Sequence, residues 1–175
     1  MERDQIETEL QRLHPETFGW ALACCGRNRS EAEDVMQLAY VKVLEGRAEF
    51  DGRSSFRTWL FGVVRLTAAE RRRRHAVRHR LLKLFFVRSL EADVPGPESA
   101  IDYSARSKKL VDGMTRLSRR QSEVLQLAFY HEMTIEQVAA LLGMSIGSAR
   151  THYARGKQNL ALMLRKAEQG TTGND

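Results

Sequence analysis

The feature that most constrains the fold is a helix–glycine–helix pattern at residues 134–157. Thr134 is followed by Gln137, the spacing at which two side chains cap the start of a helix by bonding each other's backbone N–H groups. Gly143 can adopt the left-handed conformation that ends a helix, and Ser145 can cap the helix that follows. The segment therefore predicts two helices joined by a tight turn.

Helix signals recur along the rest of the chain, whereas strand signals do not. Ser30 with Glu33, and Ser118 with Gln121, repeat the capping-box spacing, and Gly46 is a natural helix stop. No alternating apolar run of convincing length is present. We therefore expect an all-α protein.

A change in composition divides the chain. Residues 91–98 contain two prolines, one glycine and three acidic residues, which is typical of a linker. A length of 175 residues is enough for two small domains. We expect two small helical domains at 1–88 and 108–168, a flexible linker at 89–107 and a disordered tail at 169–175.

Charge is distributed unevenly between two neighbouring segments. Residues 30–51 hold six acids against two bases, and residues 65–80 hold seven arginines and two histidines against one acid. The whole chain has a net charge of +6, which permits a polyanionic partner without proving one. The first segment suits a protein partner, and the second suits phosphates.

Several classes of protein do not fit the composition. Cys24 and Cys25 are adjacent, so they cannot pair without strain, and no cluster suits a metal. No apolar run approaches the roughly 20 residues that span a bilayer, and no secretory signal is visible. No nucleophile, base and oxyanion donors come together. We expect no catalysis, cofactor, metal or membrane insertion, and a reducing cytoplasm.

The second helix of the helix–glycine–helix pattern has two distinct faces when residues are placed at about 100° intervals. The face expected to pack inward holds Ile146, Ala149, Tyr153, Leu160 and Leu164. The opposite face holds groups suited to base edges, with two cations beside it for phosphates: Ser148, Thr151, His152 and Arg155, flanked by Arg150 and Lys157. An ordinary helical hairpin with a solvated polar face fits the same pattern. Arg119 and Arg120 upstream favour phosphate contact.

The helix expected after Ser30 has an unusual second face. Its core stripe is Ala32, Val35, Met36, Ala39 and Val43, and its other side holds Asp34, Gln37, Leu38, Val41 and Glu45. Aliphatic groups rimmed by acid and amide are typical of a protein-docking surface. A third helix that covers Leu38 and Val41 would explain the same residues.

A polar loop at 49–56 leads into a helix that ends in arginines. We expect an inward face of Phe56, Trp59, Leu60 and Val63, and an outward face of Thr58, Phe61, Arg65, Ala68 and Arg72. An exposed aromatic beside arginines suits unstacked bases and single-stranded backbone. Alternatively, Phe61 is part of the core and Arg71–Arg74 is a solvated face.

These motifs together resemble a known family. Ala32-Glu-Asp-Val-Met-Gln37 and Phe56-Arg-Thr-Trp-Leu-Phe61, with the arginine-rich end, resemble the second conserved region of bacterial RNA polymerase sigma factors. Residues 117–125, 134–139 and 146–150 resemble the fourth. With both blocks in order over most of residues 10–165, the chain is similar to an extracytoplasmic function (group IV) sigma factor, a bacterial cytoplasmic protein.

The resemblance implies three binding surfaces. Core polymerase would contact Asp34, Gln37, Leu38, Val41 and Glu45. The minus-ten element would be melted and held by Phe50, Arg53, Ser54, Ser55, Phe56, Thr58, Trp59, Phe61, Arg65, Arg71 and Arg72. The minus-thirty-five duplex would contact Arg119, Arg120, Thr134, Ser148, Arg150, Thr151, His152, Arg155 and Lys157. The implied partners are core RNA polymerase, promoter DNA and an anti-sigma factor.

This chain departs from the family pattern at a few positions. Leu66 stands where family members often carry an asparagine, and a leucine cannot hydrogen-bond a base. His152 replaces a common arginine, and Tyr153 replaces a leucine. These changes would alter the promoter sequence that is read.

The main rival function is a stand-alone helix-turn-helix regulator with an N-terminal dimerisation or sensor domain. A sigma factor needs the outer face of the 30–45 helix open, whereas a dimeric regulator would bury it against a second copy. A sigma-factor inhibitor is a weaker alternative because such proteins tend to lack a DNA-reading helix.

Overall fold

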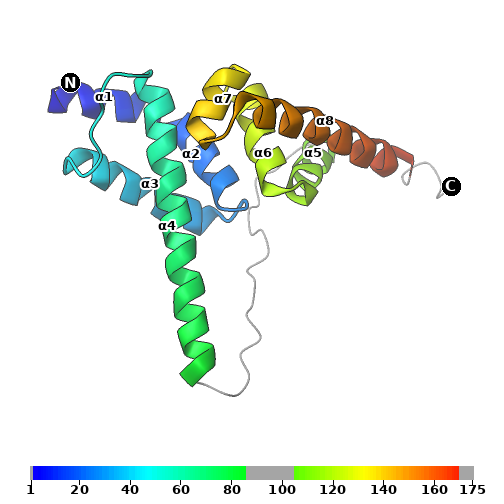
Figure 1. The fold of residues 1–175 in the computed structure, drawn as a ribbon, viewed down its shortest axis with the longest axis horizontal. Helices are drawn as coiled ribbons and strands as arrows, with labels where there is room; N and C mark the ends of the chain where they lie inside the picture. The colour runs from blue at the N-terminus through cyan, green and yellow to red at the C-terminus, as the bar shows by residue number, and fades with distance from the viewer. Residues whose placement is uncertain (1, 86–104, 170–175) are drawn as a thin grey trace. The chain divides into compact units, whose positions relative to one another are not determined.

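The computed structural model describes residues 2–85 and 105–169, and these residues are helical with connecting turns (Figure 1). The chain divides into two compact units, the first with helices α1–α4 and the second with helices α5–α8. The all-α prediction is confirmed for the described residues. None of the described helices is long and apolar enough to cross a membrane.

Some expectations fall outside the described residues. Most of the predicted linker and nearly all of the predicted tail lie there, and helix α5 already begins at Ala105.

The first unit packs four helices: α1 (Arg3–Arg12), α2 (His14–Cys24), α3 (Arg29–Leu44) and α4 (Phe56–Phe85). Trp20 of α2 is fully buried, and its indole Nε1 donates a hydrogen bond to the Phe61 carbonyl of α4 at 3.0 Å. The Trp20 and Phe61 rings stack with centroids 6.0 Å apart. Satisfying the indole N–H is what allows so large a polar-tipped ring to be the centre of this core.

Two expectations for α4 are wrong because of this packing. Phe61 and Ala68 are buried, although their phase predicted an outward position. The alternative that Phe61 belongs to the core is the correct one. Helix α4 is covered by both α2 and α3, so its buried sector is wider than one stripe.

The start of α3 also differs from the expectation. The cap is Asn28, whose side-chain oxygen accepts the Glu31 N–H at 3.0 Å, and Ser30 already lies inside the helix. Gly26 and Arg27 both have positive φ just before this cap and form a tight turn. Helix α3 therefore begins two residues earlier than predicted. Gly46, at φ 70°, follows the end of the helix as expected.

The second unit contains α5 (Ala105–Arg116), α6 (Arg119–Leu125), a π-helical turn η1 (Gln126–Tyr130), α7 (Ile135–Leu142) and α8 (Ile146–Gln169). The Thr134 and Gln137 capping box is formed, and Gly143 ends α7 at φ 62°. The Ser145 hydroxyl accepts the Ser148 N–H at 3.1 Å, which starts α8. The helix-turn-helix prediction is confirmed.

Helix α8 packs along α6 because it carries a glycine at the point of closest approach. A Cβ at Gly156 would lie 3.2 Å from the Leu125 side chain and 3.3 Å from Gln121 Cβ. Ala149 is also buried, whereas Ile146, expected to point inward, is 43% exposed at the first position of the helix. The packing side of α8 is therefore centred on Ala149 and Gly156.

Candidate functional site

The outer face of α3 is open. Leu38 is 44% exposed and Val41 is 40% exposed, and Gln37 and Glu45 are exposed beside them. No described helix buries Leu38 or Val41, so the alternative of a covering third helix is wrong within the described parts of the chain. Aliphatic groups that remain in water on a helix face, rimmed by an amide and a carboxylate, form a surface suited to another protein.

An ion pair ties this face to the arginines of α4. The Arg71 guanidinium donates to Asp34 Oδ2 at 2.6 Å, and both side chains are partly exposed. Sequence reasoning assigned Asp34 to a protein partner and Arg71 to DNA, so it did not anticipate that they bind each other. A partner that takes the Asp34 carboxylate would release Arg71.

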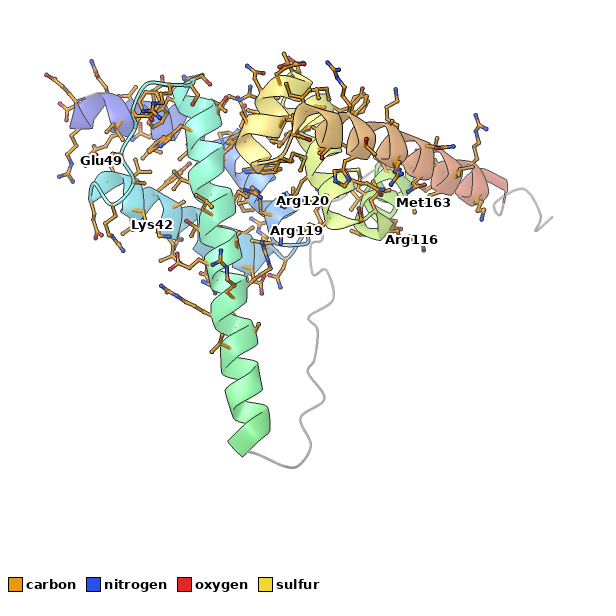
Figure 2. All side chains as sticks on the ribbon, viewed as in Figure 1. Lys42, Glu49, Arg116, Arg119, Arg120 and Met163 are labelled. Carbon is orange, nitrogen blue, oxygen red and sulfur yellow. The ribbon has the colours of Figure 1, made fainter. Side chains whose placement is uncertain are left out.

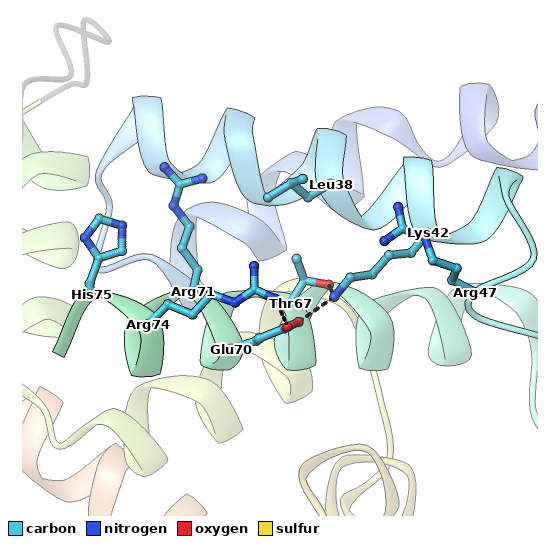
Figure 3. Close-up of a pocket in the computed structure, with 8 residues that line it drawn as sticks. All are labelled: Leu38, Lys42, Arg47, Thr67, Glu70, Arg71, Arg74 and His75. Carbon is cyan, nitrogen blue, oxygen red and sulfur yellow. Dashed lines mark hydrogen bonds and ion pairs between the residues drawn. The ribbon is translucent and has the colours of Figure 1, made fainter. Parts of the chain in front are cut away.

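A groove of about 370 Å³ lies between α3 and α4 (Figure 3). Lys42 Nζ donates to Glu70 Oε2 at 2.8 Å and to Thr67 Oγ1 at 3.2 Å across the two helices. The hydrogen bond and charge of Lys42, with the charge of Arg74, lower the pKa of Glu70. Basic residues dominate the lining, which consists of Leu38, Lys42, Arg47, Thr67, Glu70, Arg71, Arg74 and His75.

Three aromatic rings hold the 49–56 loop on the start of α4. The Phe50 ring centroid lies 5.4 Å from those of Phe56 and Trp59, and Phe56 and Trp59 are 5.1 Å apart. Phe56 is buried, whereas Phe50 and Trp59 are half-buried. Of the aromatic residues predicted for the minus-ten site, Phe50 and Trp59 thus have accessible surface, and Phe56 and Phe61 are structural in the free chain.

The polar residues of this loop are exposed. Ser55 accepts the Thr58 N–H at 3.2 Å and caps α4, and Arg53 pairs with Asp51 at 3.3 Å. Ser54 is exposed next to them. The loop therefore presents hydroxyls and one guanidinium above the aromatic cluster.

Two further arginines of α4 that were predicted to contact the minus-ten element are partly buried within the unit. Arg65 and Arg72 are half-buried, and Arg72 Nη1 donates to the Cys24 carbonyl at 2.9 Å. Leu66, by contrast, is 61% exposed on the same helix. The outer surface of α4 is therefore a mixture of guanidinium groups and two exposed aliphatic side chains, Leu66 and Val77.

In the second unit, a buried carboxylate organises two arginines at the start of α6, Arg119 and Arg120, which Figure 2 labels. Glu123 is 2% exposed and accepts hydrogen bonds from Arg119 at 2.8 Å and Arg120 at 3.2 Å. Burial of a carboxylate is costly without such partners, so the three groups hold one another in place. Sequence reasoning missed Glu123, although its i+4 and i+3 spacing from the two arginines was a usable signal.

The exposed side of α8 carries most of its predicted DNA-binding groups. Ser148, Thr151, Arg155 and Lys157 are exposed, whereas His152 is half-buried and faces the edge of the packing side. Several of these groups have intramolecular partners. The Ser148 hydroxyl accepts from Ser145 at 2.9 Å, and the Thr151 hydroxyl donates to the Gly147 carbonyl at 2.9 Å.

Other predicted residues of this region stabilise the helix-turn-helix itself. The Thr134 hydroxyl accepts the Gln137 N–H, and Arg150 pairs with Glu136 of α7 at 3.5 Å. Lys157 Nζ lies 5.1 Å above the Tyr153 ring. Backbone and side-chain hydrogen bonds within α7, with the nearby Arg150, lower the pKa of Glu136.

Comparison with known proteins gives a consistent result. Residues 10–78 match the family Sigma-70 region 2, and residues 107–160 match Sigma-70, region 4. The RNA polymerase sigma factor YlaC of Bacillus subtilis (strain 168) is 26% identical over 168 residues, which cover 95% of this chain and 96% of that protein. RNA polymerase sigma factor NccH of Alcaligenes xylosoxydans xylosoxydans is 25% identical over 162 residues, covering 91% and 87%.

A solved structure has the same fold. The sigma factor RpoE, crystallised with the anti-sigma factor NepR from Bartonella quintana, aligns with a TM-score of 0.72 at 22% identity. The alignment covers 92% of this chain and 97% of that one. The order of helices described above is therefore that of a two-domain protein already seen in crystals.

Proposed function

This chain belongs to the sigma-70 family, in its extracytoplasmic function group, and from that membership we propose how its surfaces divide the work of starting transcription. As a sigma factor it directs core RNA polymerase to promoters. It is a transcription initiation factor. The assignments of individual residues below are proposals, each supported by the geometry of one unit.

The outer face of α3 binds core polymerase. Gln37, Leu38, Val41 and Glu45 are exposed on one side of this helix, and Asp34 is partly exposed beside them. Apolar contact through Leu38 and Val41 would supply most of the affinity, and the polar rim would set the orientation. The Asp34–Arg71 pair would open as polymerase docks.

The loop before α4 and the outer surface of α4 hold the melted minus-ten element. Extruding a base costs a few kcal/mol, so stacking and phosphate contacts must offset that cost. Phe50 and Trp59 offer ring surface, Arg53, Ser54, Ser55 and Thr58 offer polar contacts, and Arg65, Arg71 and Arg72 offer charge. Phe56 and Phe61 support this surface from below rather than contact the base.

The helix-turn-helix of α7 and α8 reads the minus-thirty-five element as duplex DNA. Arg155 is exposed on α8, the helix that reads the bases. Arg119 and Arg120 are held by Glu123 in positions from which they contact phosphates. The two roles are divided between the unit of α1–α4 and the unit of α5–α8. The protein works in the bacterial cytoplasm, where its polymerase and promoters are.

An anti-sigma factor is a further proposed partner. The structural relative from Bartonella quintana was crystallised with one. The open apolar face of α3 in this chain is a surface that such an inhibitor could occupy in place of polymerase.

One observation carries the function: both sigma-70 regions are present, in order, in one chain. Run-off transcription with purified core polymerase on a genomic fragment library tests it. We expect new start sites that share an upstream motif when the chain is added. Identical transcripts with and without the chain would reject the function.

A further inference from the structure

The burial pattern of α8 shows that its most exposed stripe is rotated about the helix axis from the face that the helical periodicity of the sequence predicted for DNA contact. Ala149 and Gly156 are buried, and the residues on the opposite side of the helix are Thr151, Ala154, Arg155 and Gln158, all exposed. Their spacing of i, i+3, i+4 and i+7 is that of a continuous helix stripe. The half-buried His152 lies outside this stripe, and Ala154 and Gln158 lie within it although neither was assigned a role.

The four side chains differ in what they can offer to a base. The Thr151 hydroxyl is used by the Gly147 carbonyl, so this residue presents its methyl group, as Ala154 does. The side chains of Arg155 and Gln158 have no hydrogen-bond partner among the described residues. In the centre of the exposed stripe, these two polar groups are therefore ready to pair without breaking an existing contact.

Chemistry and spacing together assign the two groups to bases. A guanidinium binds guanine through two parallel hydrogen bonds, and a side-chain amide binds adenine in the same way. Arg155 and Gln158 are three residues apart, which is about 4.5 Å along the helix axis. The base-pair step of DNA is about 3.4 Å, so the two groups can reach base pairs one or two steps apart.

We propose that Gln158 is a specificity-determining residue of the reading helix, which pairs with an adenine one or two base pairs from a guanine bound by Arg155. This assignment rests on the proposed insertion of α8 into the major groove of the minus-thirty-five duplex. On the same stripe of α8, the methyl groups of Thr151 and Ala154 contact the major groove, where thymine methyls are the favourable neighbours.

The test uses full-length chain bound to core polymerase and duplex DNA randomised across the minus-thirty-five element. Wild-type holoenzyme should enrich a motif with a guanine and a nearby adenine. Gln158→Ala should lose the preference at the adenine position alone, by roughly fivefold to 150-fold, which is the discrimination expected of a good bidentate pair. Gln158→Glu should favour cytosine at that position, since a carboxylate accepts from the cytosine amino group.

The matched control is Asn159→Ala, which removes an amide from the next position of the same helix. The Asn159 amide donates to Gln121 at 3.4 Å on another face of the helix, so this variant should keep the wild-type motif. An unchanged motif in both Gln158 variants would overturn the proposal. A uniform loss of affinity at every sequence would also overturn it, because it would identify Gln158 as a phosphate contact.

The outcome separates this proposal from the broader function. If wild-type holoenzyme enriches no upstream motif, the assignment of α8 to the minus-thirty-five element is rejected, and with it the role of Gln158. If the wild type enriches a motif that the Gln158 variants leave intact, only the role of Gln158 fails.

Discussion

The two units differ in how they hold the side chains that meet their partners. In the first unit the charged groups are tied between helices: Asp34 binds Arg71, 37 positions away, and Lys42 binds Glu70, 28 positions away. In the second unit Arg119 and Arg120 bind Glu123 within four positions, and the Arg155 and Gln158 side chains of α8 have no hydrogen-bond partner among the described residues. A partner must rearrange the first surface, whereas the second is available as it stands.

The difference follows from how wide a side of each functional helix is buried by its neighbours. Helix α4 packs against both α2 and α3, so its polar groups meet other helices before they meet water. Helix α8 contacts α5, α6 and α7, but Ala149 and Gly156 are its only fully buried residues among those described, and its polar groups mostly face solvent. The first unit is thus suited to a role coupled to polymerase docking, and the second to reading an undistorted duplex.

The largest expected effect tests whether the two units fold independently. Trp20→Ala should lower the free energy of unfolding of the first unit by about 3–5 kcal/mol, because it removes a fully buried ring and its hydrogen bond to Phe61. Hydrogen exchange read separately for each unit should show faster exchange in α2–α4 and no change in α6–α8. Faster exchange throughout would mean that the units are one cooperative body. Trp59→Ala, at a half-buried position, is the milder control.

The next largest effect distinguishes base recognition from phosphate binding in the second unit. Arg155→Ala should weaken binding to the preferred minus-thirty-five duplex by about 1–3 kcal/mol and relax one base position. Lys157→Ala should weaken all duplexes alike and reduce the dependence of affinity on salt. Electrophoretic titration of holoenzyme on matched and mutated duplexes measures both. If the two variants behave alike, α8 does not read bases through Arg155.

The corresponding test on the first unit concerns α3. Asp34→Ala combined with Gln37→Ala should weaken binding to core polymerase by about 1–2 kcal/mol, the range of moderate interface residues. Fluorescence anisotropy of labelled chain with core enzyme measures the change.

The control for this pair is Arg71→Ala, which breaks the same Asp34–Arg71 ion pair but leaves the carboxylate for polymerase. Core binding by this variant should stay at or above the wild-type level. A loss equal to that of the double variant would mean that the ion pair only stabilises the unit.

The smallest effect concerns backbone strain, which each unit stores at one described residue other than glycine. Glu132 has φ 54° and Arg27 has φ 70°. Glu132→Gly should raise the free energy of unfolding of the second unit by roughly 0.5–1 kcal/mol, because the left-handed strain exceeds the entropy cost of glycine. Arg27→Gly should give less, since the half-buried Arg27 side chain has interactions to lose. Thermal denaturation compares the two.

Local sequence rules predicted the parts of the fold that depend on a few neighbouring residues. Thr134, Gly143 and Ser145 each act within four positions, and all three behave as expected. Asn28 displaced Ser30 as a cap because a positive-φ turn two residues earlier starts the helix sooner. In that turn the Arg27 N–H donates to the Leu22 carbonyl of α2 at 2.8 Å, a backbone contact that a capping pattern does not reveal.

Longer-range packing explains what sequence reasoning missed at the sites. Phe61 was predicted on the outer face of α4 because it lies one helical turn before Arg65. It is buried instead because it packs against Trp20, which is 41 positions away in the sequence. Glu123 was not singled out because acids next to arginines are usually solvated, whereas this one lies on the buried side of α6. The stripe of α8 was rotated because the position of Gly156, which contacts Leu125, fixes the buried side.

The central claim is that separate surfaces in one chain bind polymerase and duplex DNA. It is tested most directly by measuring, for the same two variants, affinity for core enzyme and affinity of the assembled holoenzyme for minus-thirty-five duplex. We predict a crossed result, in which Asp34→Ala with Gln37→Ala loses only core affinity and Arg155→Ala loses only duplex affinity. Losses of both affinities in both variants would contradict the division of labour.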